Sequence, residues 1–227
     1  MNLFFIFFTA LFINDGNLKP VNTFNLLRGE CSGISCYDNT CIISNDDGSV
    51  VSIDLNTKKV VPLGIYGEDF EGVAVEKNIF YLVEERSRKL LTYSIDSLKL
   101  IKTLTINYNG RLNRGFEGVT FNQDNIFVIT EKNPCMIFVI DKKNHTVSNE
   151  IILEINEASD ISFYKNHFWI LSEQDHCIYV YTKDFKLFRK YNLNLIGAEG
   201  ICFHKNQMLI SSDKLSKIYF YNIPKLK

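Results

Sequence analysis

The sequence predicts an all-β protein, a β-propeller of five four-stranded blades closed by a strand from the N-terminal region. Three observations support this fold: a strand signature returns five times, its copies lie about 40 residues apart, and many Phe and Tyr residues favour strands. The chain has 227 residues, 46% of them hydrophobic, which is enough to bury the core of one such domain. A ring of six blades is the alternative, although we find no sixth repeat.

Each copy of the signature opens an apolar strand with an acidic residue or Ser, and a second apolar strand ends on another acid. The opening residues Ser32, Glu71, Glu117, Asp160 and Glu199 are 39, 46, 43 and 39 residues apart. In the second repeat, polar turns separate the expected strands, which are residues 72–75, 79–83, 90–95 and 98–106. This order of short strands and turns is typical of an antiparallel meander.

The fifth repeat supplies only three strands before the chain ends. A sheet without its outermost strand would leave an open edge and an unclosed ring. Residues 21–27, ahead of the first repeat, are strand-like and otherwise unassigned. We therefore expect them to complete the last blade and close the circle.

The repeats predict an acidic mouth at one end of the central channel. The first strand of each blade lines the channel and runs antiparallel to the second, so the start of one lies beside the end of the other. The opening and closing acids of each repeat therefore meet at the same rim, with Glu30 or Ser32 in the opening position of the first blade. The predicted metal ligands are the carboxylates gathered there: Glu71, Glu117, Asp160, Glu199, Glu84, Glu131, Glu173, Asp213 and Asp46.

So many carboxylates repel one another unless something neutralises them. Calcium is the first candidate, because it takes about six to eight oxygen ligands in a flexible geometry. Protonation or hydration is another route, and carboxylates that accept backbone hydrogen bonds from the next blade would instead act as staples between blades. Ion pairing is the remaining alternative, with basic residues close to the acids in sequence: Arg86, Arg88, Arg111, Arg114, Lys132 and Lys214.

Gly follows the opening residue in four repeats, at positions 33, 72, 118 and 200. Gly allows a close backbone approach where strands crowd the axis. In the fourth repeat Ile161 follows Asp160, so the register there is open by one residue. Ser159 or Ser162 is the alternative to Asp160 at the axial position.

An eleven-residue apolar run at residues 3–13 stands apart from the repeats. It is too short to span a bilayer comfortably and matches the core of a signal peptide. No Lys or Arg precedes it and no clean small-residue cleavage site follows, so a buried strand of the globular domain is the alternative. We expect residues 1–19 to be a signal or membrane-anchor segment and residues 20–227 to be a single propeller domain.

Other chemistry finds little support in the sequence. The net charge of −1 does not favour nucleic acid as a partner. No phosphate-binding loop and no Ser-His-Asp or Cys-His arrangement can be identified, so no catalytic residue is named. His176 is the histidine nearest the acidic rim, and a solvated loop position is its ordinary interpretation.

The six cysteines lack the paired spacing of zinc or thioredoxin-like sites. We expect six small buried apolar side chains. The alternative concerns Cys36 and Cys41, which flank a turn and could form a disulfide across a hairpin in an oxidising compartment.

Several motifs resemble those of the SdiA-regulated (YjiK-like) β-propeller family. They are Asp-Phe-Glu-Gly-Val-Ala-Val at 69–75, Asn-Arg-Gly-Phe-Glu-Gly-Val at 113–119, Ser-Asp-Ile at 159–161 and Ala-Glu-Gly at 198–200, and the resemblance extends from about residue 21 to the end. It implies a bacterial envelope protein with an N-terminal anchor or signal, a propeller fold and a link to calcium; some members are described as phytase-like. This chain departs from the pattern in lacking basic residues before the apolar run and the fourth Gly.

The sequence therefore supports three functional hypotheses. The first is an envelope-associated, calcium-binding propeller that acts as a sensor or scaffold. The second is a metal-dependent hydrolase of a phosphate ester or lactone, in which Glu84, Glu131 or Glu173 serves as general base and the basic neighbours attract an anionic substrate. The third is a propeller that binds only protein partners. Expected partners are a divalent ion, an anionic small molecule or an envelope protein, and the membrane through the N-terminal segment.

Overall fold

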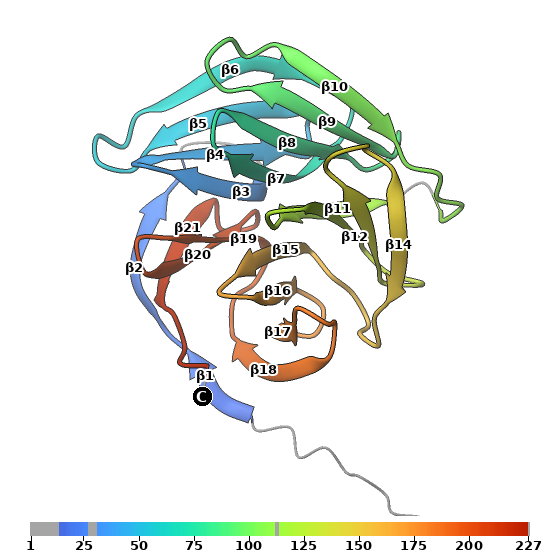
Figure 1. Ribbon diagram of the computed structural model, residues 1–227. Coiled ribbons are helices and arrows are strands. Elements are labelled where there is room, and N and C mark those ends of the chain that lie inside the picture. The colour runs from blue at the N-terminus through green and yellow to red at the C-terminus, as the bar shows by residue number, and fades with distance from the viewer. Residues whose placement is uncertain (1–13, 27–30, 112–113, 227) are drawn as a thin grey trace, which may run out of the picture.

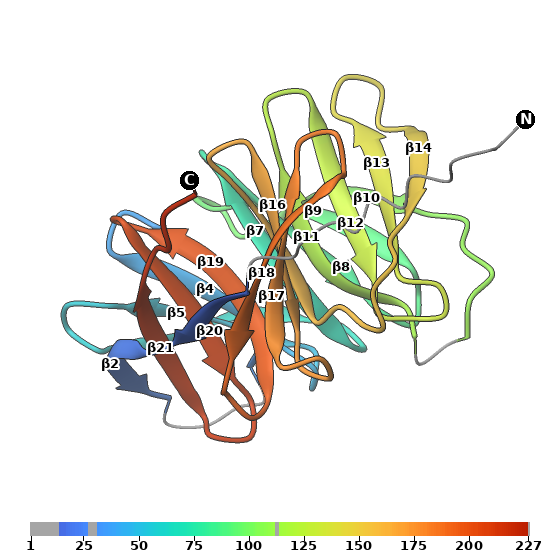
Figure 2. The same cartoon turned by 90° about the horizontal axis from the view of Figure 1, so that it is seen from below.

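The computed structural model describes residues 14–26, 31–111 and 114–226 of the chain. These residues form five sheets arranged in a ring around a central axis, which confirms the predicted five-bladed propeller (Figure 1). Seen from the side, each blade is a twisted sheet (Figure 2). Among the described residues, no helix is long and apolar enough to span a bilayer.

The first three blades follow chain order from the axis outward. Blade 1 consists of β3 (Cys31–Tyr37), β4 (Thr40–Asn45), β5 (Ser49–Asp54) and β6 (Val60–Tyr66). Blade 2 consists of β7 (Phe70–Glu76), β8 (Ile79–Glu84), β9 (Lys89–Ser94) and β10 (Leu100–Thr105). Blade 3 consists of β11 (Phe116–Phe121), β12 (Asn125–Thr130), β13 (Met136–Asp141) and β14 (Val147–Ile152).

The last two blades each contain a strand from the N-terminal region. Blade 4 consists of β15 (Asp160–Tyr164), β16 (His167–Ser172), β17 (Cys177–Thr182) and β18 (Leu187–Leu193), with β1 (Asn14–Leu18) added at its outer edge. Blade 5 consists of β19 (Ala198–His204), β20 (Gln207–Ser212), β21 (Lys217–Asn222) and β2 (Pro20–Asn25).

Strand β2 closes the ring. It pairs antiparallel with β21, with Phe24 opposite Ile218, so the start of the chain supplies the outer strand that the fifth repeat lacks. This confirms the role predicted for residues 21–27, of which residue 27 lies outside the described residues.

Strand β1 comes from the segment expected to be a signal or anchor. It runs parallel to β18, with Leu18 opposite Leu193. The apolar run at residues 3–13 lies outside the described residues. Anchoring or removal of the segment stays a prediction.

The blades are held together by one apolar cluster between each pair of neighbours. Side chains alternate across a strand, so a middle strand packs against two blades at once. In β12, Ile126 and Val128 face blade 2, whereas Phe127 and Ile129 face blade 4. The period-two aromatic stripes are therefore inter-blade packing, as predicted.

The four Gly residues of the inner strands lie where those strands crowd the axis. A Cβ atom on Gly72 would lie 2.5 Å from the Cα of Gly118, and one on Gly33 would lie 2.9 Å from the Cα of Gly72. Real Cβ atoms do not approach other atoms so closely. Close approach is thus the reason for Gly here, as the sequence suggested.

One disulfide, Cys36–Cys41, joins directly opposed residues of β3 and β4. The expectation of six unbonded cysteines is therefore wrong for these two, because the short hairpin places them face to face. The alternative disulfide is confirmed. Cys31, Cys135, Cys177 and Cys202 are buried thiols, as expected.

Candidate metal centre

A cavity of about 280 Å³ lies at one end of the central channel, and we call it the acidic mouth. Nine carboxylates and two hydroxyls line it, so its wall is almost entirely negative or polar. The lining residues are Ser32, Asp46, Glu71, Glu85, Glu117, Glu131, Glu157, Ser159, Glu173, Glu199 and Asp213.

Two sets of equivalent positions supply most of this wall. The first set is the second residue of the inner strand in four blades and the residue just before it in blade 4: Ser32, Glu71, Glu117, Ser159 and Glu199. The residues that follow this set crowd the axis, and we call them the axial layer: Gly33, Gly72, Gly118, Asp160 and Gly200. The second set is the first residue after the second strand of each blade: Asp46, Glu85, Glu131, Glu173 and Asp213. Antiparallel pairing within each blade brings the two sets to the same rim, as expected.

Seven of the nine predicted ligands line the acidic mouth, and Glu84 is one of the two that do not. Glu84 is the last residue of β8, where its carboxylate accepts a hydrogen bond from Ser87 and pairs with the Nζ of Lys89 at 3.3 Å. Glu85, the next residue, takes the position in the mouth because consecutive residues at a strand end point in different directions.

Asp160 is the other predicted ligand outside the mouth. It stands at the position that Gly fills in the other blades, and a Cβ on Gly118 would lie 2.5 Å from its Oδ1. Its side chain is buried, and its carboxylate accepts hydrogen bonds from the backbone N–H of Ile161 at 2.7 Å and of Ile201 at 2.8 Å. Asp160 is thus a staple between blades 4 and 5. Ser159 occupies the position in the acidic mouth that Glu fills in blades 2, 3 and 5, as the alternative register predicted.

Glu157 is a residue of the mouth that sequence reasoning missed. Its carboxylate accepts hydrogen bonds from the hydroxyls of Ser159 at 2.7 Å and Ser172 at 2.6 Å, and from the backbone N–H of Gln174 at 3.1 Å. Shifting the fourth repeat by one residue would have revealed it, because Glu157 then occupies the same position as Asp69 in the second repeat.

Basic side chains neutralise part of the negative charge. Lys132 pairs with Glu131, Lys214 with Glu173 at 2.6 Å, and Arg86 with Asp69 at 2.8 Å. Among the described residues, however, Glu71, Glu85, Glu117 and Glu199 form no ion pair. Arg88, another expected partner, instead donates hydrogen bonds to the carbonyl groups of Tyr108, Gly110 and Arg111.

Burial, with the charge of neighbouring carboxylates, raises the pKa of these four carboxyls. Burial, followed by the charge of a neighbouring carboxylate, raises the pKa of Glu71 and Glu117 well above the usual range. Burial is also the main cause that raises the pKa of Glu85 to about 7 and that of Glu199 to about 8. Without a cation, these four carboxyls therefore favour the neutral, protonated form.

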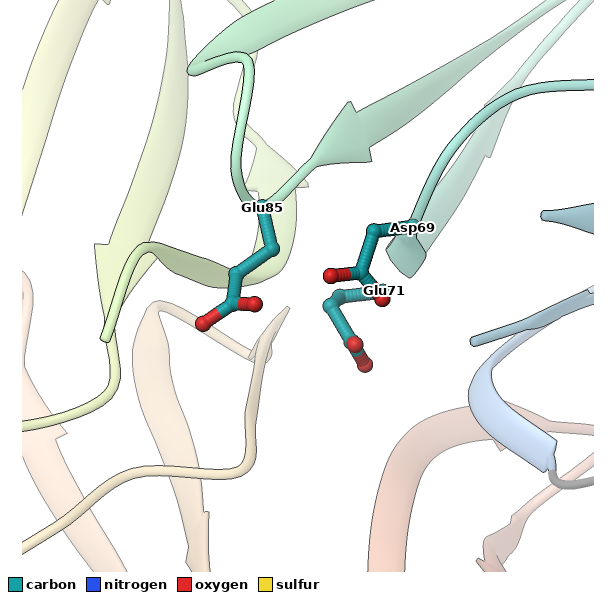
Figure 3. A group of neighbouring side chains, drawn as sticks. All are labelled: Asp69, Glu71 and Glu85. Atoms are coloured by element: carbon teal, nitrogen blue, oxygen red, sulfur yellow. The ribbon is translucent and has the colours of Figure 1, made fainter. Parts of the chain in front are cut away.

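The oxygens of these acids are close enough to share one ion. One ligand atom each from Asp69, Glu71 and Glu85 lies within 4.8 Å of the others, and the same holds for Glu85, Glu117 and Glu131. Figure 3 shows that Asp69, Glu71 and Glu85 extend into the same open space from the start of β7 and the end of β8. Clustered carboxylate oxygens are the donors that calcium prefers, so the residues present fit this ion.

Comparisons with known proteins agree with the fold. The model of the SdiA-regulated family matches residues 27–226. The structure is similar to glutaminyl cyclase of Myxococcus xanthus, with a TM-score of 0.73, 9% identity and coverage of 90% of this chain and 95% of that one. It is also similar to virginiamycin B lyase of Staphylococcus aureus, with a TM-score of 0.57, 12% identity and coverage of 89% and 99%. At such identities the likeness concerns the fold alone. No curated protein matches the sequence at a significant level.

Proposed function

The chain belongs to the SdiA-regulated family, and we propose that it binds a divalent cation, calcium, at the acidic mouth. In this proposal the ion-loaded propeller acts as a sensor or scaffold in the bacterial cell envelope. The observation that carries the proposal is the excess of carboxylates without a basic partner, Glu71, Glu85, Glu117 and Glu199. A cation from solution is the simplest source of the missing positive charge.

Glu85 is the central ligand in this proposal. It belongs to both groups of carboxylates whose oxygens can surround one ion, the group with Asp69 and Glu71 and the group with Glu117 and Glu131. The backbone N–H of Gly115 donates to Glu85 Oε1 at 3.0 Å and fixes the direction of its carboxylate. An ion between blades 2 and 3 would therefore meet one ligand whose orientation is already fixed.

The envelope is supported by the Cys36–Cys41 disulfide, because such bonds persist in oxidising compartments outside the cytosol. The apolar run at residues 3–13 supports the same location.

Hydrolysis is the second candidate, and the size of the cavity favours it. About 280 Å³ exceeds what a single hydrated ion fills, so a small ligand could bind beside the metal. Against it, Arg86 and Lys132 are already paired with acids, and these are two of the three basic residues, with Arg114, expected to attract an anionic substrate. Cation binding without an assigned substrate is therefore the better-supported function.

Calcium titration by calorimetry, with melting curves alongside, tests the proposal. We expect saturable binding and, at a calcium concentration 100 times Kd, a stabilisation of about 2.7 kcal/mol, or a rise of about 5 to 10 °C in Tm. The double variant Glu71→Gln/Glu117→Gln and the single variant Glu85→Gln should lose this calcium-dependent rise.

The matched control is Glu173→Gln, because Glu173 faces the same cavity but is already paired with Lys214. It should retain the calcium-dependent rise. Identical melting of the wild-type protein with calcium and with a chelator would refute the proposal.

A further inference from the structure

Three cysteine sulfurs meet where the ring closes. Cys36 of β3 is bonded to Cys41 of β4 in blade 1. Cys202 lies in β19 of blade 5, and its Sγ is 3.6 Å from the Sγ of Cys36. A free thiol is therefore nearly in contact with a disulfide that belongs to the neighbouring blade.

Packing of the inner strands fixes this arrangement. Strands β3 and β19 approach so closely that a Cβ on Gly200 would lie 2.9 Å from the backbone nitrogen of Ile34. Cys41 and Cys202 belong to the same buried cluster between blades 5 and 1. The two strands are held in contact by ring closure, so the third sulfur stays beside the disulfide.

Of the three sulfur-bearing residues, Cys36 is half-buried, whereas Cys41 and Cys202 are buried. A second cavity, of about 160 Å³, is lined by the inner strands on the other side of the axial layer from the acidic mouth, and both Cys36 and Cys202 belong to its wall. Cys41 is fully buried behind them. A small thiol or disulfide can thus approach Cys36, whereas Cys202 reaches Cys36 from within the protein.

We propose that these residues form a thiol–disulfide exchange site, in which the disulfide moves from Cys36–Cys41 to Cys36–Cys202. The thiolate of Cys202 attacks the Sγ of Cys36, a new S–S bond forms, and the bond to Cys41 breaks. Cys41 leaves as a thiolate and takes up the proton that Cys202 has lost. The exchange is an isomerisation, so it consumes no oxidant or reductant.

The exchange changes what the disulfide holds together. The Cys36–Cys41 bond spans a sequence separation of 5 within one hairpin, whereas Cys36–Cys202 would span 166 and join the first blade to the last. A cross-link that closes the longer loop constrains the unfolded chain more strongly. The exchanged form is a covalently locked ring. Burial raises the pKa of the Cys202 thiol, so exchange is slow and acid quenching can trap both isomers.

Peptide mapping of the protein in a glutathione redox buffer tests this proposal. Trypsin cuts after Arg28, Lys58, Lys190 and Lys205, which places Cys36 and Cys41 in one peptide, 29–58, and Cys202 in another, 191–205. A Cys31→Ala background removes the third cysteine of the first peptide. We expect a disulfide-linked pair of the two peptides after equilibration, acid quenching and alkylation, and none in the matched control Cys202→Ser.

A second variant isolates the new bond. With Cys41→Ser, oxidised glutathione should link Cys36 to Cys202 and raise Tm by about 5 °C or more over the reduced protein. Finding only glutathione-capped Cys36 in this variant, or only unlinked peptides in the equilibrated protein, would overturn the proposal. The mapping retains Cys36, Cys41 and Cys202, so it decides the question even where Cys41→Ser does not fold.

Discussion

Replacing Glu199 by Gln is expected to stabilise the calcium-free protein at pH 8 and to change its stability little at pH 5. Burial, with smaller effects of Asp213 and Glu173, raises the pKa of Glu199 from its usual 4.5 to about 8. Between these values the folded protein keeps a proton that the unfolded chain has lost. The unfolding free energy is therefore highest at low pH and falls as pH rises toward 8.

The size of this effect follows from the displacement of the pKa of Glu199. A rise from 4.5 to about 8 corresponds, at about 1.4 kcal/mol per pKa unit, to about 5 kcal/mol of stability lost at high pH. Solvent at the open mouth screens the carboxylate and neighbouring acids share the protons, so we expect about 2 to 3 kcal/mol. Gln resembles the protonated acid and should recover that amount.

Urea unfolding at pH 5, 6, 7 and 8 in the presence of a chelator measures the effect. Glu173→Gln is the control of opposite sign: burial raises the pKa of Glu173, but the Lys214 ammonium and the Gly197 N–H outweigh burial and lower it. Its contribution to stability is present above the usual carboxyl pKa and is lost as pH falls. Equal stability of the Glu199→Gln variant and the wild-type protein at pH 8 would refute the reasoning, as would a wild-type profile that is flat.

Two further predictions concern the axial layer. Gly72→Ala should lower the free energy of unfolding by about 4 kcal/mol or more, because the new Cβ would lie 2.5 Å from the Cα of Gly118. Its control is Gly64→Ala in β6, which should cost about 1 kcal/mol, because Gly64 has a φ of +70° but open space around it. Urea unfolding of both variants measures the difference. Asp160→Gly should cost about 3 kcal/mol, because the buried N–H groups of Ile161 and Ile201 lose their acceptor, whereas Asp160→Asn, whose amide oxygen can still accept, should cost less. Faster hydrogen exchange at Ile201 would accompany the loss, and unchanged exchange would contradict it.

The fold was predictable because its signal is repeated. Every blade needs the same alternation of apolar residues to pack against two neighbours, so the pattern recurs and local errors average out. The role of strand β2 was predictable because the fifth repeat supplies only three of the four strands that a blade needs. Strand β1 carried no such signal: it adds to a blade that is already complete.

The acidic mouth was predictable as a set, but not residue by residue. In the second repeat the adjacent acids Glu84 and Glu85 both match the closing position, and only the end of β8 decides which one faces the axis. The hydrophobic pattern cannot decide this, because no apolar residue follows the strand end to show which side chain faces the core and which faces the mouth. The spacing from the opening residue would have indicated Glu85, because Glu117 to Glu131 and Glu199 to Asp213 are both 14 residues, as is Glu71 to Glu85.

The prediction of Asp160 as a ligand in the fourth repeat was wrong for a different reason. Residue type alone makes Asp160 equivalent to Glu117, because three other repeats open with Glu. Physically, Asp160 replaces Gly, and Ser159 replaces the acid. In this repeat the acid stands in the axial layer and Ser stands in the mouth, and residue type alone does not reveal this exchange. The same one-residue error hid Glu157.

The crowded axial layer and the acidic mouth have a common cause. Five blades bring the inner strands so close that positions 33, 72, 118 and 200 have no room for a Cβ. Side chains one residue earlier must then share one narrow space, and three of them are Glu residues. The same geometry that requires Gly thus forces carboxylates together, and Lys132 and Lys214 pair with acids of the second set. In a ring built this way the first set depends on protons or on a cation from solution, and calcium and pH should therefore act on stability as competitors for one group of oxygens.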